Sequence, residues 1–253
     1  MESYATAQQV FAGGLIFARV GAMVMLLPGF GETAVPARIR LSFALLMALM
    51  LYPLLARTVP AIPPTTGALA GAMIKEVVIG LMIGSILRMF LSSLTVAGEI
   101  LALQTTLSFA QTAAPGQAQP TTSLSAFLGL LGLVLVMVTD LHHMFITAIA
   151  SSYSLFPFGK AVQTADAAQF AVQTVGRSFA LGVQLAAPVI VFSLVFNIAT
   201  GLIGRVMPQF QIFFVATPLS VLLGMSVFAL SLGVIGMVWT ERYEELIALF
   251  RRP

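Results

Sequence analysis

Six long apolar segments constrain this chain more than any other feature of its sequence. They run at about Val10–Pro28, Leu41–Ala56, Ala68–Leu94, Leu124–Thr139, Ser178–Gly204 and Ile212–Thr240. A helix that crosses a membrane needs roughly 20 mainly apolar residues. Charged residues make up only 8% of the chain, whereas a soluble domain carries about 25%. The sequence therefore predicts an all-α polytopic membrane protein, and it excludes a soluble globular domain and a disordered chain.

Composition also excludes several classes of function. The net charge of +3 comes from 12 Lys and Arg against 9 Asp and Glu, and no run of basic residues marks a nucleic-acid surface. The chain has no Cys, which excludes thiol catalysis, disulfides and thiolate metal sites. The nucleotide-binding, zinc-protease and serine-hydrolase motifs are absent. We predict no enzyme activity, no catalytic residue and no cofactor.

Five charged residues interrupt the apolar segments: Arg19, Lys75, Glu76, Arg88 and Glu99. A charge at bilayer depth costs at least ~2.5–3.5 kcal/mol, so each must pair, line water or face another subunit. Ion pairs that fix helix or subunit packing are the interpretation we favour. A proton or ion pathway is the alternative. Three cations against two anions leave one positive charge unmatched, which indicates a partner chain or an aqueous cavity.

Asp140, His142 and His143 form a cluster of residue types that bind metals. Asp140 and His143 share one face of a helix because they are three residues apart. His142 and His143 lie about 100° apart on a regular helix and cannot both face one ion. We predict no metal site here and interpret the cluster as a helix end at the membrane interface.

Two glycine pairs recur at helical spacing, Gly67 with Gly71 and Gly80 with Gly84. Small residues four apart let helix backbones approach closely in membrane proteins. The pattern predicts tight helix packing at both pairs and indicates no particular function.

The segment Gln104–Ser123 differs from its apolar surroundings. It has four Gln, two Pro and no charge. Pro115 and Gly116 disfavour a regular helix, and backbone groups outside a helix need water or protein partners. We therefore expect this loop to lie in a cavity or pore rather than in lipid.

The last two apolar segments predict a helical hairpin. Ser178–Gly204 and Ile212–Thr240 flank a turn that contains Arg205, Pro208 and Gln209. Before the hairpin, we expect Lys160–Arg177 to form an amphipathic interfacial helix or a connector. After it, we expect Glu241–Pro253 to be a charged tail.

Short motifs along nearly the whole chain resemble the FliR family, whose virulence counterpart is SctT, in the export gate of type III secretion. Each motif alone is weak, but their series in this order is specific. Phe109-Ala110 and Phe158-Gly159 are more similar to the flagellar pattern than to the virulence one. The other motifs are Ala18–Gly21, Leu27–Gly31, Val35–Arg40, Lys75-Glu76, Ile79–Gly84, Ala97–Glu99, Leu107–Ala110, Leu141–His143, Ser154–Gly159, Ala187-Pro188, Gly204–Phe210 and Pro218-Leu219.

The resemblance implies a single integral membrane domain over residues 1–253. It would have a FliP-like part at 1–177, a FliQ-like hairpin at 178–240 and a tail at 241–253. The chain would join FliP-like and FliQ-like subunits around an export channel, with FlhB-like and FlhA-like components nearby. This places it in the bacterial inner membrane at the flagellar basal body, in contact with membrane lipid and with exported flagellar proteins in transit.

The same resemblance implies roles for individual residues. The loop at 104–123 would plug the closed channel, through Phe109, Gln111, Pro115 and Gly116. The apolar segments would pack on other subunits. Four charged residues within them would then be buried at subunit contacts, namely Arg19, Glu76, Arg88 and Glu99. One departure is that Ala113-Ala114 precedes Pro115, where the family often has Asp, so a role for that carboxylate cannot be transferred.

Two alternatives to a flagellar gate subunit stay open. One is the virulence-type subunit, SctT. The other is a secondary transporter with a charge relay through Glu76, Arg88 and Glu99. Transporters often contain two similar halves, and no such repeat is visible in this sequence.

Overall fold

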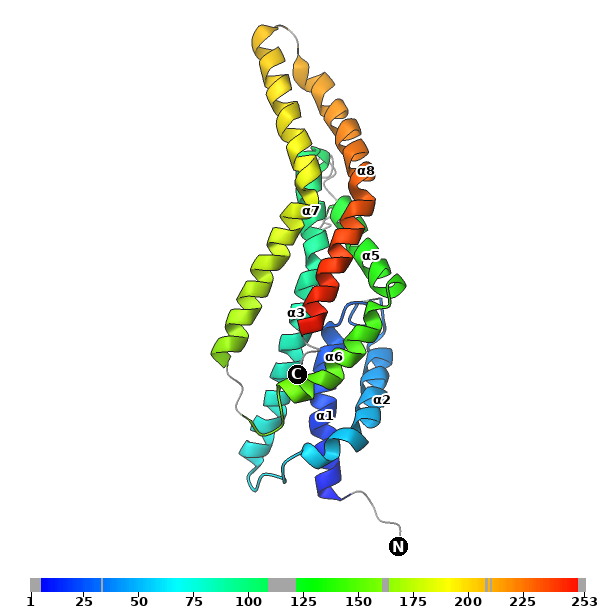
Figure 1. The fold of residues 1–253 in the computed structure, drawn as a ribbon, viewed down its shortest axis with the longest axis vertical. Helices are drawn as coiled ribbons and strands as arrows, with labels where there is room; N and C mark the ends of the chain where they lie inside the picture. Colours follow the sequence, from blue (N-terminus) through cyan, green and yellow to red (C-terminus); the bar gives the residue numbers. More distant parts are fainter. Residues whose placement is uncertain are drawn as a thin grey trace. The chain divides into compact units, whose positions relative to one another are not determined.

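The computed structural model describes residues 6–32, 34–108, 122–160, 164–207, 209 and 211–249. All regular structure in these ranges is helical. Figure 1 labels the elements, which are α1 (Ala7–Leu26), α2 (Ala37–Leu55), η1 (Ala56–Thr58), α3 (Thr66–Gln104), α5 (Ser123–Val138), α6 (Leu141–Leu155), α7 (Thr164–Val206) and α8 (Ile212–Leu249).

Five of these helices are long and apolar enough to cross a membrane: α1, α2 with η1, α3, α7 and α8. This confirms the predicted all-α polytopic membrane fold. A sixth span exists only if α5 and α6 are counted together. The break between them lies at Asp140, which has a φ of 58° in the left-handed region.

The last two helices extend beyond the apolar segments of the predicted hairpin. The helix that the sequence allowed before Ser178 is continuous with the hairpin, because α7 runs without interruption from Thr164 to Val206. The segment before Ser178 is rich in Ala and Gln, which favour helix. The charged tail is also largely helical, because α8 continues to Leu249. Its residues Tyr243, Leu246 and Ile247 are buried.

The chain forms two compact units. Unit 1 consists of Met1–Phe90, Val136–Val175 and Glu244–Pro253, and unit 2 of Leu91–Leu135 and Gly176–Tyr243. The long helix α3 contributes its first part to unit 1 and its remainder to unit 2. The predicted division at residue 177 into FliP-like and FliQ-like parts stays a prediction.

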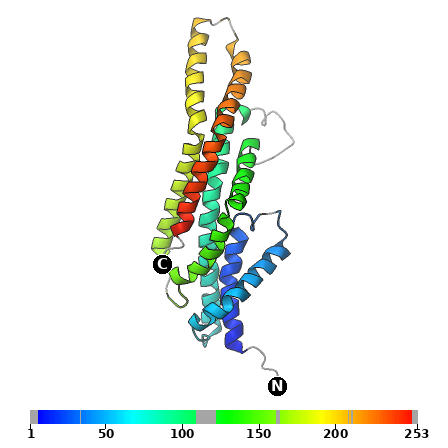
Figure 2. The same ribbon diagram turned by 45° about the vertical axis from the view of Figure 1, so that its right-hand side comes forward.

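In unit 1, α1 packs against α2 and η1, and Figures 1 and 2 show α1 and α2 side by side. A core cluster of Phe11, Ala12, Leu15 and Val59 holds this end of the unit. α3 approaches α1 at the second glycine pair. A Cβ on Gly80 would lie 2.5 Å from the carbonyl oxygen of Arg19. This contact confirms close packing at Gly80 and Gly84.

The first glycine pair behaves differently. A Cβ at Gly67 or at Gly71 would meet no atom within 4 Å. The expected close approach of helices at this pair is therefore wrong among the residues that the structure describes. Identical spacing predicted both pairs equally, and only the second pair has a helix across from it.

In unit 2, α7 and α8 form an antiparallel hairpin, seen in both Figures 1 and 2. Neutral side chains make several of the contacts between helices of this unit. The indole nitrogen of Trp239 donates to the Ser93 hydroxyl at 3.1 Å, and the Ser193 hydroxyl donates to the Gln104 side chain at 2.7 Å. Glycine permits close contact here too, since a Cβ on Gly182 would lie 2.9 Å from the Ser93 carbonyl oxygen.

Candidate functional site

Arg19 is the most constrained charged residue that the structure describes. It lies on α1 among Leu15, Ile16, Val20 and Met23, and its side chain has no exposed surface. A fully buried guanidinium is costly unless its donors are satisfied. The surrounding residues therefore have to supply acceptors.

Glu76 on α3 supplies the charged acceptor. Its Oε2 lies 2.6 Å from both Nε and an Nη atom of Arg19. The two backbones come close enough for this pair because Gly80 follows Glu76 by one helical turn and carries no side chain. The pair is buried within one chain, with side-chain exposures of 0% and 3%.

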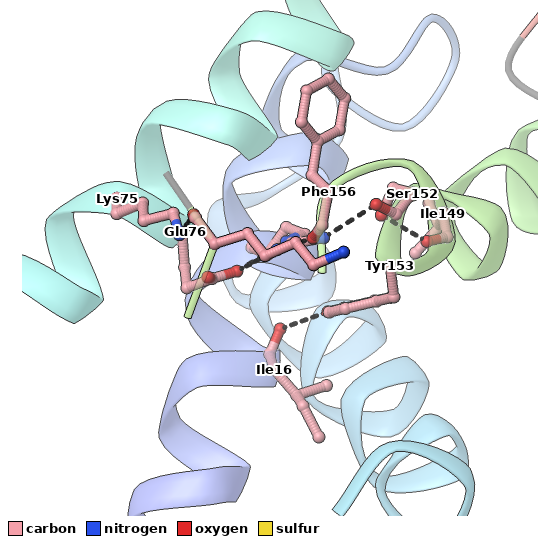
Figure 3. Close-up of polar contacts among 9 residues, drawn as sticks. Ile16, Lys75, Glu76, Ile149, Ser152, Tyr153 and Phe156 are labelled. Carbon is pink, nitrogen blue, oxygen red and sulfur yellow. Dashed lines mark hydrogen bonds and ion pairs between the residues drawn. The ribbon is translucent and has the colours of Figure 1, made fainter. Parts of the chain in front are cut away.

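Two carbonyl groups at the end of α6 supply the remaining acceptors. Arg19 donates to the Ser152 carbonyl at 3.0 Å and to the Phe156 carbonyl at 2.8 Å. The Ser152 carbonyl also accepts the Phe156 backbone amide at 2.9 Å, and carbonyls at the end of a helix attract cations. Arg19 therefore binds the C-terminal end of α6 as well as α3, and Figure 3 labels Ser152, Phe156 and Glu76 around this contact.

Two aromatic rings complete the surroundings. The Cζ atom of Arg19 lies 4.2 Å from the ring centroid of Tyr153 and 5.3 Å from that of Phe158. Arginine over an aromatic face is attracted by the ring quadrupole. The Tyr153 hydroxyl donates to the Ile16 carbonyl on α1 at 3.2 Å (Figure 3). We call these residues the Arg19 cluster: Arg19, Glu76, Ser152, Tyr153, Phe156 and Phe158.

The Arg19 cluster joins three helices, α1, α3 and α6, through a satisfied ion pair. We interpret the cluster as a structural joint, because the described hydrogen bonds of the guanidinium all go to protein acceptors. Sequence reasoning identified Arg19 and Glu76 as charges that must find partners. It did not identify Ser152 and Phe156, because they contribute main-chain carbonyls, which every residue type has. It also did not identify Tyr153, whose ring reaches Arg19 through the tertiary fold.

Lys75 and Arg88 have weaker partners. The Lys75 ammonium donates to the main-chain carbonyl of Lys160. Arg88 lies 3.9 Å from Glu32, and their side chains are 43% and 30% exposed. Sequence reasoning left one cation unmatched because it counted only charges inside apolar segments. Glu32, in the turn before α2, is the carboxylate that it did not count.

Glu99 serves a different contact in unit 2. Its Oε1 accepts from the Thr122 backbone amide at 3.0 Å, immediately before α5 begins. The Ser125 hydroxyl donates to the Thr95 carbonyl at 2.9 Å, and a Cβ on Gly98 would lie 2.4 Å from the Ser125 Cα. A carboxylate is favourable at a helix N-terminus. Glu99 therefore fixes the start of α5 against α3.

Glu76, Arg88 and Glu99 do not form a relay within the described residues. All three lie on α3. At about 1.5 Å per residue, Glu76 and Arg88 are roughly 18 Å apart along the helix, and Arg88 and Glu99 roughly 16 Å. Each has its own partner elsewhere in the fold. The contacts support ion pairing over proton transfer.

The structure brings Asp140, His142 and His143 closer than helix geometry suggested. One ligand atom from each lies within 4.8 Å of the others, and the two imidazole rings are 4.1 Å apart. The argument that the two histidines cannot face one ion is therefore wrong, because side-chain torsions turn the rings together. His143 also lies 3.6 Å from the Asp140 carboxylate, and both side chains are largely exposed.

The predicted plug residues Phe109, Gln111, Pro115 and Gly116 lie outside the described residues, as does Pro208 of the hairpin turn. The ends of the predicted loop agree with the helices, since α3 ends at Gln104 and α5 begins at Ser123. Arg205 is exposed in the last turn of α7, where a cation favours the helix dipole. Gln209 is also exposed.

Comparison with known proteins identifies the family. The family model for bacterial export proteins, family 1, matches residues 10–246. The flagellar biosynthetic protein FliR of Caulobacter vibrioides is 65% identical over 250 residues, which cover 99% of this chain and 100% of that protein. The chain belongs to the FliR family. This confirms the family predicted from the motifs.

More distant members of the FliR family match with similar coverage. The flagellar biosynthetic protein FliR of Aquifex aeolicus is 27% identical and covers 93% of this chain and 91% of its own length. The flagellar biosynthetic protein FliR of Escherichia coli is 28% identical, and the match covers 91% of this chain and 88% of that protein. As a member of a flagellar export family with several apolar spans, the chain is a membrane component of flagellum biogenesis and protein transport.

Proposed function

We propose that the chain is a non-enzymatic subunit of the flagellar type III export gate. It would join FliP-like and FliQ-like subunits around the channel through which flagellar proteins leave the cytoplasm, in the inner membrane at the basal body. FlhB-like and FlhA-like components and the exported proteins in transit are the further partners. The observation that carries the proposal is the 65% identity with a flagellar FliR over the whole chain.

The surface of unit 2 supports an assembly role. In the apolar window of α8 only 17% of residues are buried, and in that of α7 only 33%. Exposed large side chains on the hairpin include Val195, Leu202, Phe214, Leu222 and Leu230. Contiguous exposed apolar patches of this kind mark lipid or subunit contacts.

Expression alone and with partners tests the proposal. We expect the chain by itself to aggregate or degrade, and co-expression with FliP-like and FliQ-like subunits to give a stable complex that restores motility to a fliR-deficient cell. A stable monodisperse monomer that carries a small solute across vesicles, with no partner, would contradict it and favour the transporter alternative.

We further propose that residues 104–123 plug the closed channel. The support is their uncharged polar composition within an apolar chain and the positions where α3 ends and α5 begins. Deleting Ala110–Gln119 should leave the complex assembled but leaky to ions or small solutes, and Phe109→Ala should leak less. Conductance of bilayers that carry the complex is the measurement. An assembled deletion variant as tight as the wild type would remove the plug role.

A further inference from the structure

A pocket of about 260 Å³ opens in unit 1 beside the Arg19 cluster. Its walls come from α1, the first turns of α3 and the segments that follow η1 and α6. Apolar and small residues line most of it, and its two charged residues are Lys75 and Glu76. The volume is below the ~300–1,000 Å³ of pockets for drug-sized ligands, so the pocket fits a small group or one part of a longer amphiphile.

Lys75 and Glu76 of the pocket lining, together with Arg19 behind it, carry a net charge of +1. Glu76 directs its carboxylate to Arg19 at 2.6 Å, so these two charges balance each other. Among the described residues, the Lys75 ammonium donates to the main-chain carbonyl of Lys160 and takes part in no ion pair. With Arg19 and Glu76 paired, the Lys75 ammonium is the charge left to attract an anion.

The hollow depends on small residues of α3. Gly71 lines the pocket, and a Cβ there would meet no atom within 4 Å. The opposite walls are firm, because Leu15 belongs to the core cluster, Phe158 packs against that cluster, and the Phe158 ring lies against Arg19. The pocket is therefore formed before any ligand arrives.

The position suits a lipid. Pro60 and Gly159 of the pocket wall lie just beyond the ends of η1 and α6, and helix ends in a membrane protein lie near the headgroup region. Basic pockets between transmembrane helices bind anionic headgroups, and a long lysine side chain reaches from an apolar wall to a polar group.

We propose that this pocket binds an anionic phospholipid, with the phosphate at Lys75 and apolar atoms of the same lipid against Leu15, Gly71 and Phe158. The phosphate replaces the Lys160 carbonyl as the partner of the ammonium. The lipid would link the start of α3 to the segment after α6, on the surface of unit 1 that the first glycine pair leaves open.

Native mass spectrometry of the purified full chain, with any subunits that accompany it, tests this site. Phosphatidylglycerol and phosphatidylcholine are titrated in turn, and retained lipid is counted. Because a lysine near anionic lipid contributes about 1 kcal/mol, we expect about fivefold preference for phosphatidylglycerol. Lys75→Gln should abolish this preference, and Gly71→Leu should abolish retention of both lipids by filling the pocket.

Gly67→Leu is the matched control. Gly67 lies one turn earlier on α3, is equally unobstructed, and does not line the pocket. It should retain lipid as the wild type does. Equal retention by Gly71→Leu and wild type would overturn the proposal. So would full displacement of the lipid by inorganic phosphate alone, or loss of a partner subunit rather than lipid in Gly71→Leu.

Discussion

Units 1 and 2 hold their helices together by different means. In unit 1 a buried charge joins α1, α3 and α6, with Arg19 fully enclosed and paired to Glu76. In unit 2, neutral pairs such as Trp239 with Ser93 join the helices, together with the half-buried Glu99 carboxylate at the start of α5. Apolar exposure occurs in both units, since 22% of the apolar window is buried in α2 of unit 1 and 17% in α8 of unit 2.

The difference indicates where each unit needs something outside the chain. The ion pair satisfies the buried charges of unit 1, whose helix α2 still has only 22% of its apolar window buried. Most of the α7 and α8 surface lacks cover within the chain, and lipid or other subunits must provide it. Two of the charges expected at subunit contacts, Arg19 and Glu76, are thus paired within the chain, and the exposed apolar faces of α2, α7 and α8 are the better candidates for such contacts.

Removing the charge of Arg19 should have the largest effect. Arg19→Leu leaves the buried Glu76 carboxylate unpaired, and breaking a buried pair costs about 3–5 kcal/mol. We expect loss of folded protein and of the export complex, measured by yield on size-exclusion chromatography. Arg19→Lys should recover only part of the yield, because an ammonium lacks the planar fork that reaches one carboxylate and two carbonyls. Normal yield and motility in Arg19→Leu would show that unit 1 does not depend on the pair.

A charge on the bare face of unit 2 should have the next largest effect. Leu230 on α8 is 85% exposed. Leu230→Arg places a charge where lipid or an apolar subunit is expected, at a cost of about 2.5–3.5 kcal/mol at bilayer depth. We expect less complex on co-purification, while Leu230→Ala, the neutral control, assembles. Equal assembly of both variants would mean that water reaches this face.

Loss of the Glu99 carboxylate should cost less. Glu99→Gln keeps an acceptor for the Thr122 amide but removes the negative charge at the start of α5, which contributes about 0.3–1 kcal/mol. Thermal denaturation should show a small decrease in stability, while Glu99→Ala should lower it further. If a proton relay needed this carboxylate, cells that carry Glu99→Gln would instead lose motility completely, while the stability of the protein would be unchanged.

The pair of Arg88 and Glu32 should contribute least. Both side chains are partly exposed and 3.9 Å apart, and exposed pairs contribute about 0–1 kcal/mol. Glu32→Gln should therefore leave yield and melting temperature nearly unchanged. A loss comparable to that of Arg19→Leu would show that the contrast between buried and exposed pairs is wrong.

Much of the fold follows from the sequence, since apolar length predicts the spans and the motifs predict the family. The predicted loop and turn also agree with the ends of α3 and α7. Continuity was less predictable. The residues before Ser178 and after Thr240 are polar, but many of them also have high helix propensity. Their polarity predicts exposure to water and does not exclude that the helices continue through them.

The site was predictable only in part. A charge in an apolar segment shows that a partner must exist, and Arg19 and Glu76 were identified in this way. The remaining acceptors of Arg19 come from the end of α6, which packs against α1. This is a tertiary contact that no local sequence pattern predicts. The two glycine pairs make the same point, because one faces a helix and the other an open pocket.

The central claim is that the Arg19 cluster is a structural joint and that no proton passes through it. The most direct measurement is motility and complex yield of the neutral double variant Arg19→Gln with Glu76→Gln. Replacing both charges removes the buried-charge penalty that each single change leaves behind. The account predicts that the double variant assembles and swims better than Arg19→Gln alone. A double variant that assembles fully but exports nothing would contradict it.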